Sequence, residues 1–217
     1  MLPVALGLPA DRPLSLLCIG AHSDDIEIGC GGTVLRLLAD YPGTQVHWVV
    51  LSADDEREAE ARASAADFLA DAKSADVTVC RFRESYFPYI ATEVKDFFNA
   101  LRRDVNPDVV LSHHRHDEHQ DHRTVAQLTW NTFRDHVIAE YEIPKFEGDL
   151  GHPNLYVPLT DAQVERKVEL LLRHFATQKG RTWFRPQTFR GLAAVRGVEC
   201  NAPDGYAEAF HARKLVL

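Results

Sequence analysis

The stretch GAHSDDIEIGCGGT, residues 20–33, decides the fold and can be interpreted in two ways. Its second half, EIGCGG, resembles the glycine loop with which methyltransferases bind a nucleoside cofactor. Its first half, HSDD, has the side chains of a metal site with a spare carboxylate. The two interpretations predict different proteins, and the position of the preceding strand separates them.

The glycine-loop interpretation requires an acidic residue and three spaced glycines at the end of a strand. Glu27 and two glycines fit this pattern, but Thr33 stands where the third glycine belongs. The apolar run of the strand ends at Ala21, six residues before Glu27, and the two adjacent aspartates in between are poor strand formers. We therefore favour the metal-site interpretation and expect no nucleoside cofactor.

Short runs rich in Val, Leu and Ile surround this stretch and are typical of buried parallel strands. Four of them cover residues 14–21, 44–53, 76–82 and 107–113. Helix-favouring stretches follow them at 31–40, 56–72, 92–103 (with Thr92 as the expected N-cap) and 123–137. This alternation predicts an α/β fold: a single Rossmann-like domain with a mainly parallel sheet and helices on both faces.

The C-terminal part continues the same pattern without a domain boundary. Residues 142–154 are rich in Gly and Pro and predict a long loop, and residues 155–159 predict a strand. A strong amphipathic helix follows at 160–175, with Thr160 and Gln163 as a capping box. We expect residues 1–217 to form one domain.

Composition restricts the possible partners. The chain has 24 basic and 32 acidic residues, a net charge of −8, and no basic stripe, so nucleic acid is not an expected partner. No apolar run reaches the ~18 residues of a membrane span, and residues 1–13 lack the charged start of a signal peptide. We expect a cytoplasmic protein. The cysteines stand too far apart for a disulfide framework or a cysteine zinc site.

Ligand-type side chains follow the first and the fourth predicted strands. HSDD spans residues 22–25, and HHRHDEHQDH spans residues 113–122 and holds five of the eleven histidines. HSDD alone would also suit a helix N-cap. Ligands bind at the carboxyl ends of strands in open α/β sheets, and imidazole with carboxylate suits zinc. The two clusters together predict a metal site.

At these residues the chain resembles the PIG-L/LmbE-like family of metal-dependent N-acetylglucosaminyl deacetylases. AHSDDIEIGCGG (21–32) is similar to the first family motif, with Ser23 in place of a proline. HQDH (119–122) is similar to the second motif, and YAEAF (206–210) resembles a signature near the C-terminus. The stretch 81–89 lacks the Pro-Asp-Gly-like turn of many relatives.

The resemblance implies a zinc-dependent hydrolase that removes the N-acetyl group from a small-molecule amino sugar or its conjugate. The metal ligands that it implies are His22, Asp25 and His122, a set that another divalent transition metal would also accept. It implies that Asp24 is the general base, that His119 stabilises the transition state, and that Asp121 is the partner of His119.

Some assignments stay open at this point. A metal- or sugar-binding protein of the same fold without turnover is the alternative to an enzyme, although pure binding would need neither Asp24 nor His119. Glu27 would either orient a ligand or act as a first-turn acid. His113, His114 and His116 would either support the ligands or only shape the pocket. The acceptor sugar and the oligomeric state cannot be read from the sequence.

Overall fold

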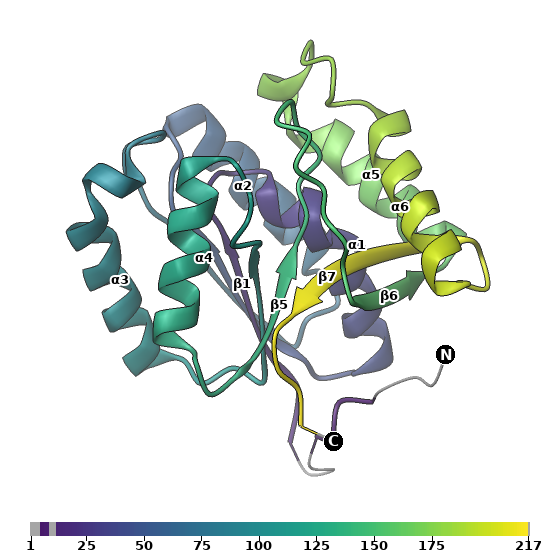
Figure 1. The fold of residues 1–217 in the computed structure, drawn as a ribbon, viewed down its shortest axis with the longest axis horizontal. Coiled ribbons are helices and arrows are strands. Elements are labelled where there is room, and N and C mark those ends of the chain that lie inside the picture. The colour runs from purple at the N-terminus through teal and green to yellow at the C-terminus, as the bar shows by residue number, and fades with distance from the viewer. Residues whose placement is uncertain (1–4, 9–11, 217) are drawn as a thin grey trace.

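A seven-stranded sheet forms the centre of the protein in the computed structural model, which describes residues 5–8 and 12–216 (Figure 1). The strands are β1 (Ser15–Gly20), β2 (Gln45–Val50), β3 (Ser74–Val79), β4 (Val109–His113), β5 (Val137–Tyr141), β6 (Leu155–Leu159) and β7 (Tyr206–Ala212). Their order is β3-β2-β1-β4-β5-β7-β6, and the first five are parallel. β7 runs antiparallel to both β5 and β6. The mainly parallel sheet is confirmed.

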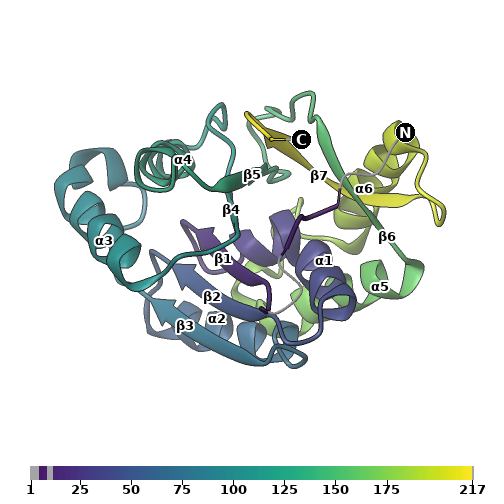
Figure 2. The same cartoon turned by 90° about the horizontal axis from the view of Figure 1, so that it is seen from below.

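Helices cover both faces of this sheet, as predicted (Figure 2). They are α1 (Asp25–Asp40), α2 (Asp55–Phe68), α3 (Ala91–Asp104), α4 (Gln120–Thr132), α5 (Asp161–His174) and α6 (Pro186–Cys200), with short 3₁₀ turns η1 (Phe87–Tyr89) and η2 (Ala176–Gln178). α1, α2 and α5 enclose one apolar core, in which Trp48 stacks on Phe68. α3 and α4 enclose a second core, which contains Phe98 and Phe133.

Several predicted boundaries were wrong. The first helix begins at Asp25, before the glycines, and bends at Cys30, where φ is −146°. Thr92 lies inside α3, because the helix begins one residue earlier and Ile90 precedes it without a side-chain cap. The Thr160 capping box is present, and residues 142–154 form the expected loop.

The bend in α1 is held by a carboxylate from the other end of the chain. Glu208 on β7 accepts hydrogen bonds from the amides of Gly32 (2.9 Å) and Thr33 (2.6 Å), the donors freed at the bend. Lys167 on α5 donates to Glu208 (2.6 Å) and to the carbonyl of Ile28 (2.6 Å). We call these groups the α1 brace. Glu208 belongs to the YAEAF stretch, which thereby shapes the helix that begins at the predicted metal site.

Close packing also explains one glycine of the first motif. A Cβ at Gly29 would lie 2.2 Å from the ring of Tyr141, so any side chain there would collide with β5. The hydroxyl of Tyr141 donates to the carbonyl of Ile19 at 2.7 Å and ties β5 to β1.

None of the helices in the described part of the chain is long and apolar enough to cross a membrane. The prediction that residues 1–13 are not a signal peptide falls largely outside the described residues.

Candidate metal centre

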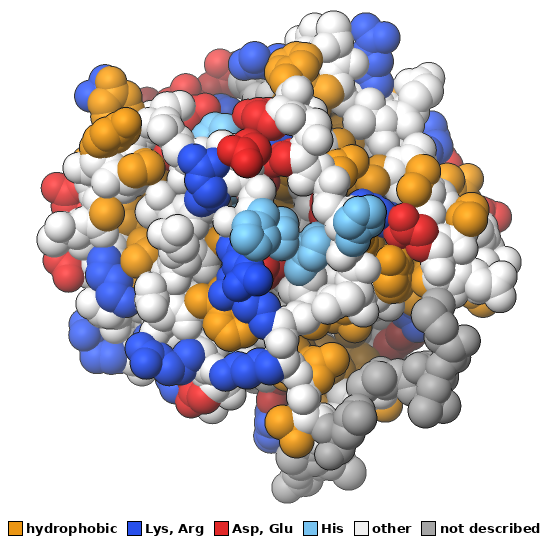
Figure 3. Space-filling model, in the orientation of Figure 1, with side chains coloured by type: hydrophobic (Ala, Val, Ile, Leu, Met, Phe, Trp, Pro, Cys, Tyr) orange, Lys and Arg blue, Asp and Glu red, His pale blue; other side chains and the backbone are white. Residues whose placement is uncertain are grey.

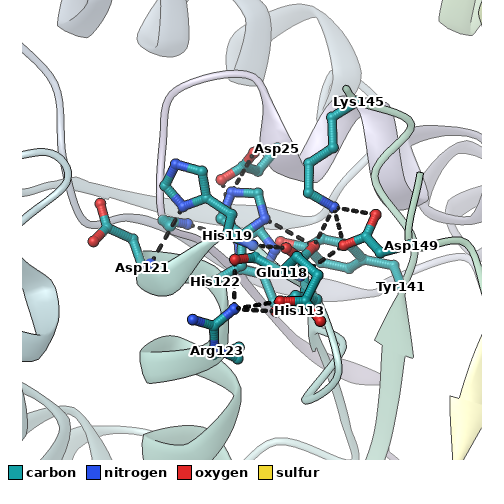
Figure 4. Close-up of polar contacts among 12 residues, drawn as sticks. Asp25, His113, Glu118, His119, Asp121, His122, Arg123, Tyr141, Lys145 and Asp149 are labelled. Carbon is teal, nitrogen blue, oxygen red and sulfur yellow. Dashed lines mark hydrogen bonds and ion pairs between the residues drawn. The ribbon is translucent and has the colours of Figure 1, made fainter. Parts of the chain in front are cut away.

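The two ligand-rich stretches meet at the carboxyl ends of β1 and β4, which are neighbours in the sheet. HSDD forms the turn from β1 into α1, and residues 114–119 form the loop from β4 into α4. The side chains brought together are buried: His22 is 7% exposed, Asp25 4% and His122 3%. Figure 4 shows Asp25, His113, His119 and His122 gathered at this edge.

The three predicted ligands lie at the spacing of a zinc site. The Nδ1 atom of His22 lies 3.2 Å from Nε2 of His122 and 3.3 Å from Oδ2 of Asp25. Nε2 of His122 lies 3.5 Å from Oδ1 of Asp25. Tetrahedral ligands at bond lengths of about 2.0–2.1 Å stand about 3.3–3.4 Å apart. The three residues therefore fit three ligand positions of a tetrahedrally bound ion.

Two further histidines adjoin the same point. Potential ligand atoms lie within 4.8 Å of one another in two triads, His22 with His119 and His122, and Asp25 with His113 and His122. Nε2 of His113 accepts the amide hydrogen of Ala21 at 2.9 Å, which occupies the lone pair that a metal would need. His113 is thus placed to support the turn, and its Nε2 lies 3.1 Å from Oδ2 of Asp25.

The electrostatic field at the centre favours a positive charge. Burial lowers the pKa of His22, but Asp25 and Asp121 outweigh it and raise this pKa to about 10. Burial raises the pKa of Asp25, but His122, His113 and His22 hold it well below its usual range. Burial and the neighbouring His113 lower the pKa of His122 to about 3, so this imidazole is neutral and the positive charge lies on His22.

Each predicted histidine ligand has a carboxylate behind it. Oδ2 of Asp117 lies 2.9 Å from Nδ1 of His122, and Oδ2 of Asp121 lies 3.2 Å from Nε2 of His22. Such partners fix the tautomer and the ring orientation of a ligand. The expected pairing of Asp121 with His119 is therefore corrected, because the Asp121 carboxylate is directed at His22 and the amides of Ser85 (2.6 Å) and Phe87 (3.1 Å).

His119 stands at the open side of the centre as a neutral donor. It is half-buried, and its ring lies 4.9 Å from that of His22 and 4.5 Å from that of His122. Burial and the nearby His22 lower its pKa. Its Nδ1 accepts the amide hydrogen of Asp121 at 3.3 Å, which leaves Nε2 as the protonated nitrogen.

Asp24 lies beside the ligands but contacts a guanidinium. Nη2 of Arg57 donates to Oδ1 of Asp24 at 2.9 Å, and Nε of Arg57 donates to Oγ of Ser23 at 2.7 Å. Burial raises the pKa of Asp24 to about 6, and Arg57 opposes this rise. Ser23, the departure from the family motif, thus anchors the cation that faces the proposed base.

A lysine on the long loop completes the support of His122. Nζ of Lys145 lies 3.1 Å from Oδ2 of Asp117 and donates to both oxygens of Asp149, at 2.7 and 2.6 Å (Figure 4). Asp149 also accepts from the amide of Glu118 at 2.7 Å. The loop 142–154 is thereby tied to the loop 114–119, which ends directly before the helix that carries His122.

Sequence reasoning missed Arg57, Asp117 and Lys145 at this centre. Asp117 could have been found from its place in the His-rich run, five residues before His122 on the entry to a helix. Glu27 is fully buried in the first turn of α1, where burial raises its pKa to about 8 although the hydroxyl of Ser64 opposes this rise.

The chain matches the family model described as "PIG-L: GlcNAc-PI de-N-acetylase" over residues 17–133. A search of curated protein sequences found no significant match.

Solved structures share the fold over nearly the whole chain. N,N'-diacetylchitobiose deacetylase from Pyrococcus horikoshii is 23% identical with a TM-score of 0.71, covering 96% of this chain and 87% of that one. The conserved protein TT1542 from Thermus thermophilus is 21% identical with a TM-score of 0.74, over 94% and 96%. The 4-carboxy-2-hydroxymuconate hydratase GalB from Pseudomonas putida is 18% identical with a TM-score of 0.75, over 94% and 98%. A deacetylase and a hydratase thus share this fold, so the fold alone does not determine the reaction.

Proposed function

The chain belongs to the PIG-L family of GlcNAc-PI de-N-acetylases, and from this premise we propose that it is a zinc-dependent hydrolase that removes the acetyl group from an N-acetylated amino sugar or its conjugate. The observation that carries the proposal is the approach of His22, Asp25 and His122 to within 3.2–3.5 Å of one another. Asp24 lies beside them, and the products would be acetate and a free amine.

In this proposal His22, Asp25 and His122 hold the metal. A zinc ion bound there would supply a Lewis acid for the amide carbonyl and lower the pKa of water to about 7. Asp117 and Asp121 keep the two imidazoles in the required orientation, because each accepts a hydrogen bond from the nitrogen that faces away from the centre.

Asp24 is the proposed general base. It accepts a proton from the attacking water and passes it to the nitrogen of the departing amine. Arg57 keeps Asp24 available for this role, because the guanidinium favours the carboxylate form against the effect of burial. The proton thus moves from the water through one buried carboxylate to the leaving group.

His119 is the proposed stabiliser of the tetrahedral transition state. Its Nε2–H can donate a hydrogen bond to the oxyanion that develops from the carbonyl oxygen. A neutral imidazole suffices for this donation, since the backbone amide of Asp121 already determines the tautomer. Asp121 therefore acts on the reaction through His22 and through its own amide.

A screen of N-acetylhexosamine derivatives tests the proposal. Protein supplied with zinc should release equal amounts of acetate and primary amine from at least one of them, and protein treated with a chelator should not. Metal binding without any release of acetate would overturn the proposal and favour a binding protein without turnover.

A further inference from the structure

A second cluster of histidines lies outside the metal centre. It lines a cleft of about 580 Å³, which we call the histidine cleft; its basic side chains are His114, His116, His152, His211, Arg115 and Arg213. Histidine and basic side chains gather near the middle of the face shown in Figure 3. The His-rich run divides here: His113, His119 and His122 face the metal centre, whereas His114 stacks on His211, with ring centroids 3.7 Å apart.

The acidic groups of the cleft are already occupied. Glu140 is 1% exposed and accepts hydrogen bonds from Nδ1 of His114 (3.0 Å), Nε1 of Trp130 (2.5 Å) and the guanidinium of Arg213. The other lining carboxylate, Asp149, pairs with Lys145. Neither acid is placed to neutralise Arg115, which is exposed and whose Nε donates to Nε2 of His116.

Two buried polar atoms of the lining lack a partner. Nε of Arg213 and Nε2 of His211 have no hydrogen-bond partner among the described residues. A buried donor without an acceptor is unfavourable, and a bound ion or water is one way in which native proteins satisfy such a group. Burial and the neighbouring His114 lower the pKa of His211 to about 4, and Arg213 is paired with Glu140, so the positive charge of the cleft comes from Arg115.

The arrangement of side chains in the histidine cleft suits an anion and not a metal ion. In the described part of the chain, side chains converge with metal-ligand spacing only at the centre on β1 and β4, and neither triad includes a residue of the cleft. Guanidinium groups bind phosphate and carboxylate through paired N–H donors. The volume also falls in the range of about 300–1,000 Å³ that is typical of small-molecule sites.

We propose that the histidine cleft binds the phosphate or carboxylate group of a small molecule about the size of a sugar. Arg115 supplies the charge, because Arg213 is paired with Glu140, and the histidines supply further N–H donors. This proposal does not depend on the deacetylase reaction, because none of the lining residues is among the predicted metal ligands or catalytic residues.

Calorimetry with inorganic phosphate, malonate and glucose tests the proposal. We expect phosphate or malonate to bind at submillimolar to low millimolar concentration and glucose not to bind. The anion that binds more tightly shows whether the cleft prefers a phosphate or a carboxylate group. Arg115→Gln should weaken this binding by about tenfold or more, since hydrogen bonds between charged groups are the strong ones. Arg190→Gln, which removes an exposed guanidinium on α6, is the matched control and should not change it.

The metal centre could itself attract an anion, so the titrations are repeated with His122→Ala. Retained binding in this variant supports the cleft, and lost binding would place the anion at the centre and overturn the proposal. Equal binding by the parent and by Arg115→Gln, or no binding of either anion, would overturn it as well. Arg115 is exposed, and thermal unfolding of Arg115→Gln checks that its fold is intact.

Discussion

Two buried polar clusters lie along α1, one at its first turn and one at its bend. The metal centre places Asp25 among imidazoles, with His22 and His122 only 3.2 Å apart. In the α1 brace, Lys167 and Glu208 form an ion pair at 2.6 Å, and both also bind backbone groups of the helix. Both clusters are less than 10% exposed, yet their charges are arranged differently.

This difference distinguishes the α1 brace, which stabilises the fold, from the metal centre, which is suited to binding and catalysis. In the brace, each charge meets an opposite charge and the remaining hydrogen bonds go to backbone groups, so the cluster is complete. At the candidate metal centre, several ring nitrogens and a carboxylate converge on one point, an arrangement that a bound cation would complete. We therefore expect changes in the brace to affect stability and changes at the centre to affect metal binding and rate.

The largest expected effect is on the rate, at Asp24. Asp24→Asn keeps the size of the side chain and removes its basicity, so the turnover rate should fall about 10²–10⁴-fold while metal remains bound. Turnover is measured by acetate release, and metal content by elemental analysis after dialysis.

Asp25→Asn is the matched control for this variant. It should lose metal and rate together, because an amide oxygen is a poor substitute for a carboxylate on zinc. Loss of metal from Asp24→Asn with retention by Asp25→Asn would exchange the two roles. Full activity in both variants would show that HSDD only caps the helix and has no role in metal binding or catalysis.

The brace should show the largest effect on stability. Glu208→Gln leaves Lys167 as a buried charge without its counter-ion, which typically costs about 3–5 kcal/mol of unfolding free energy. For a chain of this size, that change lowers the melting temperature by about 6–20 °C. Differential scanning calorimetry measures the shift.

The same variant tests how separate the two clusters are. Zinc content per folded molecule should match that of the parent, because Glu208 touches only the bend. If Glu208→Gln kept the stability of the parent but lost zinc, the brace would be needed for metal binding and not for the stability of α1.

The sequence predicted the metal centre better than the brace, for a physical reason. His22 and Asp25 lie within one local motif, and the second cluster follows another strand of the same sheet. The order of the strands therefore suffices to bring them together. Glu208 acts on amides 175 and 176 residues away, and no local pattern indicates that contact.

Local sequence patterns also gave wrong helix boundaries where the path of the backbone determines the start of a helix. The glycines of the first motif suggested a helix start, whereas Asp25 begins the helix and Cys30 bends it. The N-terminal turn of α2 is rich in charge, so by sequence Arg57 looks like part of a charged helix face, and only the fold reveals that it reaches Asp24. Thr92 suited an N-cap by residue type, but the turn of η1 leads directly into α3.

A smaller effect is expected at Lys145, which supports the centre from outside. Lys145→Met removes the charge that holds Asp117, and changes in groups behind a metal ligand typically weaken metal affinity by about 10–100-fold. Competition with a zinc chelator measures this affinity. The absorption spectrum of the cobalt-substituted protein should shift, because the orientation of His122 changes.

Lys145→Arg distinguishes positioning from simple packing. Restored charge should recover part of the affinity, since an arginine can still reach the two aspartates. Unchanged affinity and an unchanged cobalt spectrum in Lys145→Met would show that Asp117 holds His122 without help from the loop.

The smallest effect on stability is expected at an exposed ion pair. Glu165→Gln makes the same chemical change there as Glu208→Gln makes in the brace. Glu165 pairs with Arg190 at 2.5 Å, but both side chains are exposed, and water can solvate either charge when its partner is removed. Glu165→Gln should therefore leave the midpoint of urea unfolding unchanged within error, whereas Glu208→Gln lowers it clearly. Repeating both titrations in high salt sharpens the contrast, because salt screens exposed pairs far more than buried ones. Equal losses in the two variants would mean that the number of ion pairs, and not their burial, sets the stability of this fold.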